Sequence, residues 1–124
     1  MARRTQLSPH QLHRLDLACR PLAGVGFGPF LVGSAMEHSG YRDVDVRLIL
    51  DDDAWDGMFG ESADDKGEAH HHPWWLAVCA ALSHWLSDVS GLPVDFQIQR
   101  QTQANEHYAG LPRNSLGGGR PWTL

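Results

Sequence analysis

The chain has 124 residues, of which 42% are hydrophobic, and this is enough for one compact domain with its own core. Its formal net charge of -5 argues against a general nucleic-acid-coating role, because such proteins present a basic face. No apolar stretch approaches the roughly 20 residues of a membrane span and the N-terminal residues are polar, so we expect a cytoplasmic protein without a signal peptide or a membrane partner.

The first predicted element is a helix that begins after Ser8. Ser8 as the N-cap, Pro9 at the first helical position and Gln11 at the third form a capping box, in which side chains satisfy free backbone N–H groups. Apolar residues then recur at helical spacing and predict one buried stripe: Leu12, Leu15, Cys19 and Leu22. The two cysteines, Cys19 and Cys79, both lie in apolar helical patterns, and we expect reduced, buried thiols.

Three strands are predicted further along the chain. The first is a short buried run at residues 30–32, which Gly33 and Ser34 break. The second covers residues 43–50, where Asp43 and Asp45 share one face because side chains alternate along a strand. The third covers residues 94–99, where Asp95 belongs to the polar face of a regular alternation.

The segments between the strands are predicted to be mostly helical. Residues 35–42 form a short turn or helical fragment, and a short helix after Asp51 carries Trp55, Met58 and Phe59 inward. The acidic residues 60–72 lack periodicity and predict a mobile loop. A longer helix begins near Pro73, with Gly91 in a favourable C-cap position, and its apolar side carries Trp75, Val78, Leu82, Trp85 and Val89. Its three tryptophans, Trp74, Trp75 and Trp85, are expected in the core. A short polar helix at 102–108 precedes an extended, Pro/Gly-rich end.

This order of elements predicts an α/β (α+β) fold, in which a small mixed sheet of three strands packs its apolar face against helices. The helices are expected on that one face only. The other face is then left open, and it carries three acids: Asp43, Asp45 and Asp95.

The three acids predict a divalent-metal site. Neighbouring carboxylates repel one another and stay ionised together only when a cation or strong donors neutralise them. An Asp-x-Asp pair alone is usually a solvated strand edge, but here Gly33 and Ser34 precede it and a third strand-borne acid follows. Gly33 lets the backbone approach a phosphate and Ser34 offers a hydroxyl, while Mg²⁺ is the oxygen-liking ion expected beside phosphates.

With these motifs in place, Leu31-Val32-Gly33-Ser34, Arg42-Asp43-Val44-Asp45-Val46 and Val94-Asp95-Phe96, the chain resembles the polymerase beta-type nucleotidyltransferase superfamily, most closely its minimal single-domain members. The resemblance covers roughly residues 25–100. It implies a nucleotidyltransferase-like domain at 1–109 with a C-terminal tail at 110–124. It also implies transfer of a nucleoside monophosphate from a nucleoside triphosphate, ATP among them, to a protein, an RNA end or a small molecule.

The resemblance further implies a role for each site residue. Gly33 and Ser34 would hold the triphosphate, Asp43 and Asp45 would bind two metal ions, and Asp95 would complete the acceptor-side ion, with Mg²⁺ as the cofactor and Mn²⁺ as a substitute. The basic residue usual after Gly-Ser is absent, since Ala35-Met36-Glu37-His38 stands there. Phosphate charge would then fall to other arginines: Arg42, Arg47, Arg113 or Arg120.

That departure keeps a second hypothesis open, a catalytically weak or inactive relative that binds nucleotide or a partner protein and acts as a regulator. In a chain this short, a homodimer or a partner is expected to complete the site. Two further segments have open interpretations. His70, His71 and His72 suit either a transition metal or a solvated or nucleotide-adjacent loop, and His38 and Tyr41 are either phosphate contacts or solvated turn residues.

Overall fold

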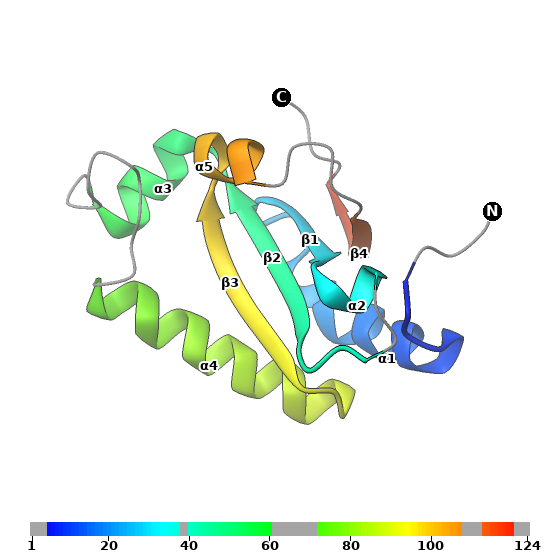
Figure 1. The fold of residues 1–124 in the computed structure, drawn as a ribbon. Coiled ribbons are helices and arrows are strands. Elements are labelled where there is room, and N and C mark those ends of the chain that lie inside the picture. Colours follow the sequence, from blue (N-terminus) through cyan, green and yellow to red (C-terminus); the bar gives the residue numbers. More distant parts are fainter. Residues whose placement is uncertain (1–4, 38–39, 61–71, 108–112, 121–124) are drawn as a thin grey trace.

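The computed structural model describes residues 5–37, 40–60, 72–107 and 113–120, and these residues form a sheet with helices packed on it (Figure 1). The sheet has four strands in the order β3-β2-β1-β4. β1 (Phe27–Val32) pairs antiparallel with both β2 (Val44–Leu50) and β4 (Asn114–Arg120), whereas β2 and β3 (Val94–Arg100) are parallel. The predicted mixed α/β fold is therefore confirmed.

The main core lies on one face of this sheet. There the apolar residues of β2 and β3 pack against two long helices, α1 (Pro9–Cys19) and α4 (Pro73–Ser90). α3 (Asp52–Phe59) adds Trp55 and Phe59 to the same core. A short 3-10 turn at Arg20–Leu22 and a one-turn helix, α2 (Ser34–Glu37), complete this part. No helix among the described residues is long and apolar enough to cross a membrane.

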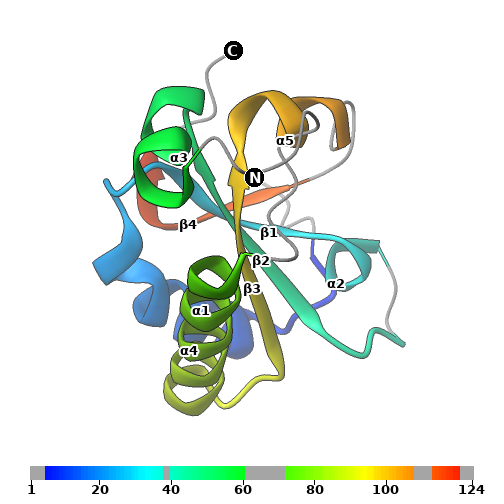
Figure 2. The same ribbon diagram turned by 90° about the vertical axis from the view of Figure 1, so that its left-hand side faces the viewer.

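The opposite face is only partly open, which corrects the expectation that helices cover one face alone. α5 (Gln101–His107) follows β3 directly, and its Ala104 closes a second apolar cluster with Phe30, Val32 and Ile49. In Figure 2, α4 and α5 lie on opposite sides of β3. α5 thus covers this face at the end where β3 finishes. The part of the face that stays accessible is the end where β2 and β3 begin.

The fourth strand, β4, was not predicted, because the glycines at 117–119 have low strand propensity. Its glycine at 117 is required by packing: a Cβ there would meet the Cys19 carbonyl oxygen at 2.7 Å, and the backbone φ is +66°. The Gly117 N–H donates to Asp16 Oδ1 at 2.6 Å, and Leu116 is fully buried. Residues 114–120 of the expected tail therefore belong to the sheet.

The buried side of α4 is rotated from the predicted one. Trp75, Cys79 and Leu86 are buried, but Trp74 and Trp85 are 56% and 37% exposed, so the prediction that these two tryptophans lie in the core is wrong. Val89 is also exposed, as is Met58 on α3, which was expected to point inward. The helix is rotated because it turns a polar stripe, formed by Ser83 and Ser87, rather than its largest apolar residues, towards the edge of the sheet.

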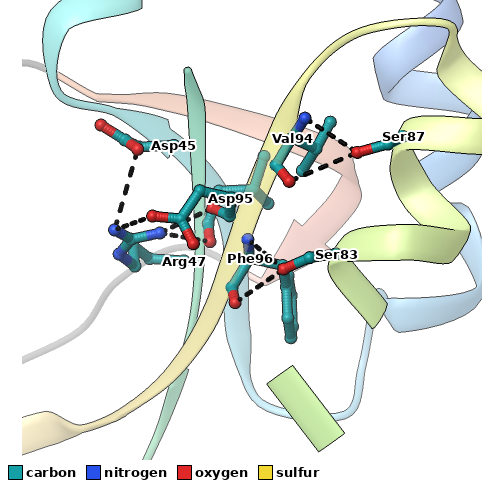
Figure 3. Close-up of polar contacts among 8 residues, drawn as sticks. Asp45, Arg47, Ser83, Ser87, Val94, Asp95 and Phe96 are labelled. Carbon is teal, nitrogen blue, oxygen red and sulfur yellow. Dashed lines mark hydrogen bonds and ion pairs between the residues drawn. The ribbon is translucent and has the colours of Figure 1, made fainter. Parts of the chain in front are cut away.

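The polar stripe forms hydrogen bonds with the outer edge of β3, alongside which α4 lies (Figure 3). The Ser83 hydroxyl accepts from the Phe96 N–H at 2.8 Å and donates to the Phe96 carbonyl at 3.2 Å. Ser87 does the same with Val94, at 2.9 Å and 3.3 Å. Trp75 Nε1 donates to the Ile98 carbonyl at 2.9 Å. An edge strand that would otherwise expose unpaired backbone groups is thereby covered.

The start of α1 is as predicted. Ser8 Oγ accepts from the Gln11 N–H at 3.1 Å, and Gln11 Oε1 accepts from the Ser8 N–H at 2.9 Å. Leu7 before the cap is fully buried, and Leu12 packs against the same core. Both cysteines are free, buried thiols as expected, and burial raises the pKa of Cys19 to about 12, with the charge of Asp16 adding to the rise.

Replacement of Ser8 by Ala is expected to lower the free energy of unfolding by about 1 kcal/mol, because the capping hydrogen bond to the Gln11 N–H is lost and the reciprocal bond is weakened. Urea denaturation followed by circular dichroism measures the change. Ser8→Asp is the matched control, since its carboxylate keeps an acceptor at the cap and should leave stability nearly unchanged. Equal losses in the two variants would contradict the capping account.

Candidate metal and nucleotide site

Two acids of the predicted site lie side by side on neighbouring strands. Asp45 and Asp95 are partners in the parallel register of β2 and β3. Paired residues on neighbouring strands point to the same face of a sheet, and the residues on either side of each acid belong to the main core. Both acidic side chains therefore project to the opposite face. Asp43 comes directly before β2, where the chain enters the strand, and its side chain is exposed. The structure therefore brings the three acids to one end of the sheet, with Asp43 outside the strand.

Arg47 lies between the two strand-borne acids (Figure 3). Its Nη2 is 3.5 Å from Asp95 Oδ2 and 3.9 Å from Asp45 Oδ1. Its Nη1 donates to the Asp95 backbone carbonyl at 2.8 Å and to the Val46 carbonyl at 3.1 Å. The residue is only 8% exposed. Arg47 was predicted to bind nucleotide; the structure places its guanidinium in a buried position, against the acids themselves.

Gly33 lies directly against the carboxylate of Asp45. It follows β1, its φ is +74°, and its carbonyl accepts from the Met36 N–H at 3.0 Å to start the turn of α2. A Cβ built on Gly33 would collide with Asp45 Oδ2. A side chain at this position would thus be strained by the backbone and would displace the acid. Gly33 is needed to admit Asp45, a role that the sequence did not reveal.

Gly33→Ala is expected to cost about 1–3 kcal/mol of stability, because alanine is strained at positive φ and its methyl group collides with Asp45. Gly118→Ala is a matched control: Gly118 has a φ of +73°, but nothing lies within 4 Å of a Cβ built there. The excess cost at Gly33 therefore measures the collision. Thermal unfolding measures both glycine variants, each alone and each combined with Asp45→Ala. The excess stability loss of Gly33→Ala over Gly118→Ala should disappear in the Asp45→Ala background. An excess that persists there would contradict the contact between Gly33 and Asp45.

A pocket of about 480 Å³ opens beside this turn. Its lining joins the turn after β1 to the entry of β2: Ser34, Gly40, Tyr41, Arg42, Asp43 and Asp45. Two carboxylates, two hydroxyls (those of Ser34 and Tyr41) and one guanidinium thus belong to the residues that line a single concave surface. Of the expected phosphate-neutralising arginines whose side chains the structure describes, Arg42 is the one that lines this pocket.

The environment of Asp45 disfavours its charged form. Burial raises the pKa of Asp45 above its usual value, the nearby Arg47 lowers it, and the negative charges of Asp95 and Asp43 raise it further, with a net rise. The positive charge of Arg47 therefore does not fully offset the effect of burial together with that of the two neighbouring acids on the pKa of Asp45. A cation bound by Asp45 would favour the ionised carboxylate and remove this electrostatic cost.

The donor set fits one hard cation at Asp43 and Asp45. Both acids line the pocket, and both offer the oxygen ligands that Mg²⁺ and Mn²⁺ prefer. Asp95 fits a second ion less well, because Arg47 already holds its side chain and its carbonyl. Within the described ranges, no group of three or more His, Cys, Asp or Glu side chains is arranged as a metal site.

Comparison with protein-family models, with curated proteins and with solved structures found no match.

The remaining candidate residues have other positions. The guanidinium of Arg113 stacks over the Phe30 ring, with its carbon 5.3 Å from the ring centroid. The side chain of Arg120, together with His38, His70 and His71, lies outside the described residues. His72 caps α4, where its Nδ1 accepts from the Trp74 N–H at 3.2 Å. That contact gives His72 a structural role at the start of the helix.

Sequence reasoning missed the part that Arg47 plays in the site. The available signal was its position two residues after Asp45 on the same strand, which places it on the face of the acids. A charged residue inside an otherwise apolar strand is buried only when it is paired. This rule, applied to Arg47, points to an acidic partner on the adjacent strand rather than to a ligand.

Proposed function

We propose that the chain is a metal-dependent nucleotidyltransferase, which moves a nucleoside monophosphate from a nucleoside triphosphate to an acceptor. The observation that carries the proposal is the convergence of Asp43, Asp45 and Ser34 on one pocket beside the Gly33 turn, with Asp95 on the next strand. These are the groups expected for phosphoryl transfer, which depends on holding phosphates and on balancing their charge.

Each residue has a part in this proposal. Asp43 and Asp45 bind the divalent ion, and Ser34 and Arg42 contact the phosphates, the first through its hydroxyl and the second through its charge. Gly33 admits the Asp45 carboxylate to the pocket. When bound, Mg²⁺ would supply charge neutralisation on the transferring phosphate. Asp95, held by Arg47, adds negative charge on the acceptor side.

A second candidate function is supported by one observation, the buried guanidinium between Asp45 and Asp95. A permanent cation at that position reduces the need for a metal ion there. Together with the absence of a basic residue in α2, this suits a nucleotidyltransferase-fold protein that binds nucleotide but transfers it slowly or not at all. Such a protein would act as a nucleotide- or partner-binding regulator.

Label transfer distinguishes the two functions. The protein is incubated with α-³²P-labelled nucleoside triphosphates and Mg²⁺ or Mn²⁺, with itself, total RNA and a small-molecule extract offered as acceptors. The enzyme predicts metal-dependent labelling of one acceptor class, which Asp45→Ala abolishes. Metal-dependent nucleotide binding without labelling would instead identify the regulator. Absence of any metal-dependent nucleotide binding would contradict both.

A further inference from the structure

We propose, on the basis of the nucleotidyltransferase site described above, that Arg47 takes the place of a second metal ion. The chain would then hold a single divalent ion, at Asp43 and Asp45, and the Arg47 guanidinium would provide the positive charge beside Asp95. This makes Arg47 a positioning residue: it orients the two strand-borne acids through direct contacts and fixes how many ions the site accepts.

Hydrogen bonds to the main chain fix Arg47 in place. Its Nη1 donates to two backbone carbonyls, those of Asp95 at 2.8 Å and Val46 at 3.1 Å. Backbone carbonyls of paired strands cannot move aside as side chains can. The guanidinium is also largely removed from solvent, since the residue is 8% exposed. An ion that displaced the guanidinium would separate this buried positive charge from its hydrogen-bond partners, which is strongly unfavourable.

The positive charge of the Arg47 guanidinium lies beside both strand-borne acids. Arg47 Nη2 lies 3.5 Å from Asp95 Oδ2 and 3.9 Å from Asp45 Oδ1, so a fixed positive charge already occupies the space between these acids (Figure 3). A divalent cation bound between the same carboxylates would repel the guanidinium at close range. Burial of the Arg47 side chain reduces the solvent screening of this repulsion, although the Asp95 side chain is itself 44% exposed. The pair Asp45–Asp95 is therefore closed to a second ion.

The two carboxylate oxygens of Asp45 have different neighbours, and one of them faces the Gly33 turn. Its Oδ1 is the atom near the guanidinium, whereas Oδ2 lies against Gly33. Asp45 also lines the pocket with Asp43, whose side chain is exposed. One carboxylate thus serves two cations, the guanidinium on one side and the pocket ion on the other. This arrangement leaves room for one ion.

Counting bound Mn²⁺ tests the inference. Purified protein is titrated with Mn²⁺ alone, and free Mn²⁺ is measured by electron paramagnetic resonance. We expect one ion per chain. Asp43→Asn and Asp45→Asn should each weaken Mn²⁺ binding by at least about tenfold, whereas Asp95→Asn should retain one ion with less than about a threefold change. Asp88→Asn, an exposed acid on α4, is the control for general loss of negative charge.

The outcomes separate this inference from the proposed function. Two ions in the parent, one of which is lost in Asp95→Asn, would overturn the role of Arg47 and leave a metal-dependent transferase intact. Absence of bound Mn²⁺ would overturn both. In Arg47→Gln, monitored by circular dichroism, a rise from one ion to two is the positive result. If that variant fails to fold, the parent and Asp95→Asn titrations still decide the question.

Discussion

Replacement of Asp45 by Asn is expected to abolish metal-dependent nucleotide binding and, at the same time, to stabilise the free protein at neutral pH. Asparagine keeps the size of the side chain but removes the negative charge that we propose to hold a divalent ion at the pocket. Because the pocket ion would lose one of its two carboxylates, we expect nucleotide affinity in Mg²⁺ to fall by about 100-fold or more. Isothermal titration calorimetry with a nucleoside triphosphate measures this loss.

The stability gain follows from the direction of the pKa shift of Asp45. Its pKa is raised in the folded protein above the ordinary value of 3.8, mainly by burial. The folded state therefore holds its proton more tightly than the unfolded state does, and stability falls as the pH rises from 3.8 through the folded pKa. The neutral amide of the Asp45→Asn variant carries no such penalty.

The stability difference between the Asp45→Asn variant and the parent should therefore grow with pH over this interval and remain constant at neutral pH. Thermal unfolding across this range measures the difference, with Asp88→Asn as the control for an exposed acid. A variant that is less stable than the parent at neutral pH, or that keeps metal-dependent nucleotide binding, would contradict the account of Asp45.

The second large effect is expected from removal of both hydroxyls that cover the β3 edge. Ser83→Ala together with Ser87→Ala leaves the N–H and C=O groups of Phe96 and Val94 without their partners on α4. An unsatisfied backbone group in a partly buried position costs about 1–3 kcal/mol, and water compensates for some of this loss. We expect the double variant to lose about 2–4 kcal/mol, a large share of a typical folding stability of about 5–15 kcal/mol.

The same double variant should also associate, because an uncovered edge strand is a template for pairing with another chain. Chemical denaturation measures the stability and light scattering measures the association. His84→Ala, which removes an exposed side chain from the same helix, is the control and should change neither property. A double variant as stable and as monodisperse as this control would show that the serines do not seal the edge.

Local signals predicted the elements that form the site. The Ser8 capping box, the alternation around Asp45 and the alternation around Asp95 each depend on neighbouring residues, and each element formed where expected. The mixed sheet followed from the order of these elements. The pairing of Asp45 with Asp95 was inferred only as a shared face, and the structure adds their direct register.

Features that depend on distant contacts were not predictable in the same way. β4 pairs with β1 and places Gly117 against the backbone of Cys19, contacts that its own glycine-rich sequence does not indicate. Trp74 and Trp85 are exposed because Ser83 and Ser87 face the β3 edge, and hydrophobicity alone would have placed the tryptophans inward. Arg47 was assigned to a ligand because its charge was visible in the sequence, while its contacts with Asp95, on the neighbouring strand, were not.

The central claim is that the pocket at Asp43 and Asp45 binds a nucleoside triphosphate through a divalent ion. A fluorescent nucleoside triphosphate titrated with the protein, with anisotropy measured in Mg²⁺ and again in EDTA, tests this claim most directly. The account predicts saturable binding that is at least about tenfold tighter in Mg²⁺. Equal affinity in Mg²⁺ and EDTA, or no binding in either, would contradict it.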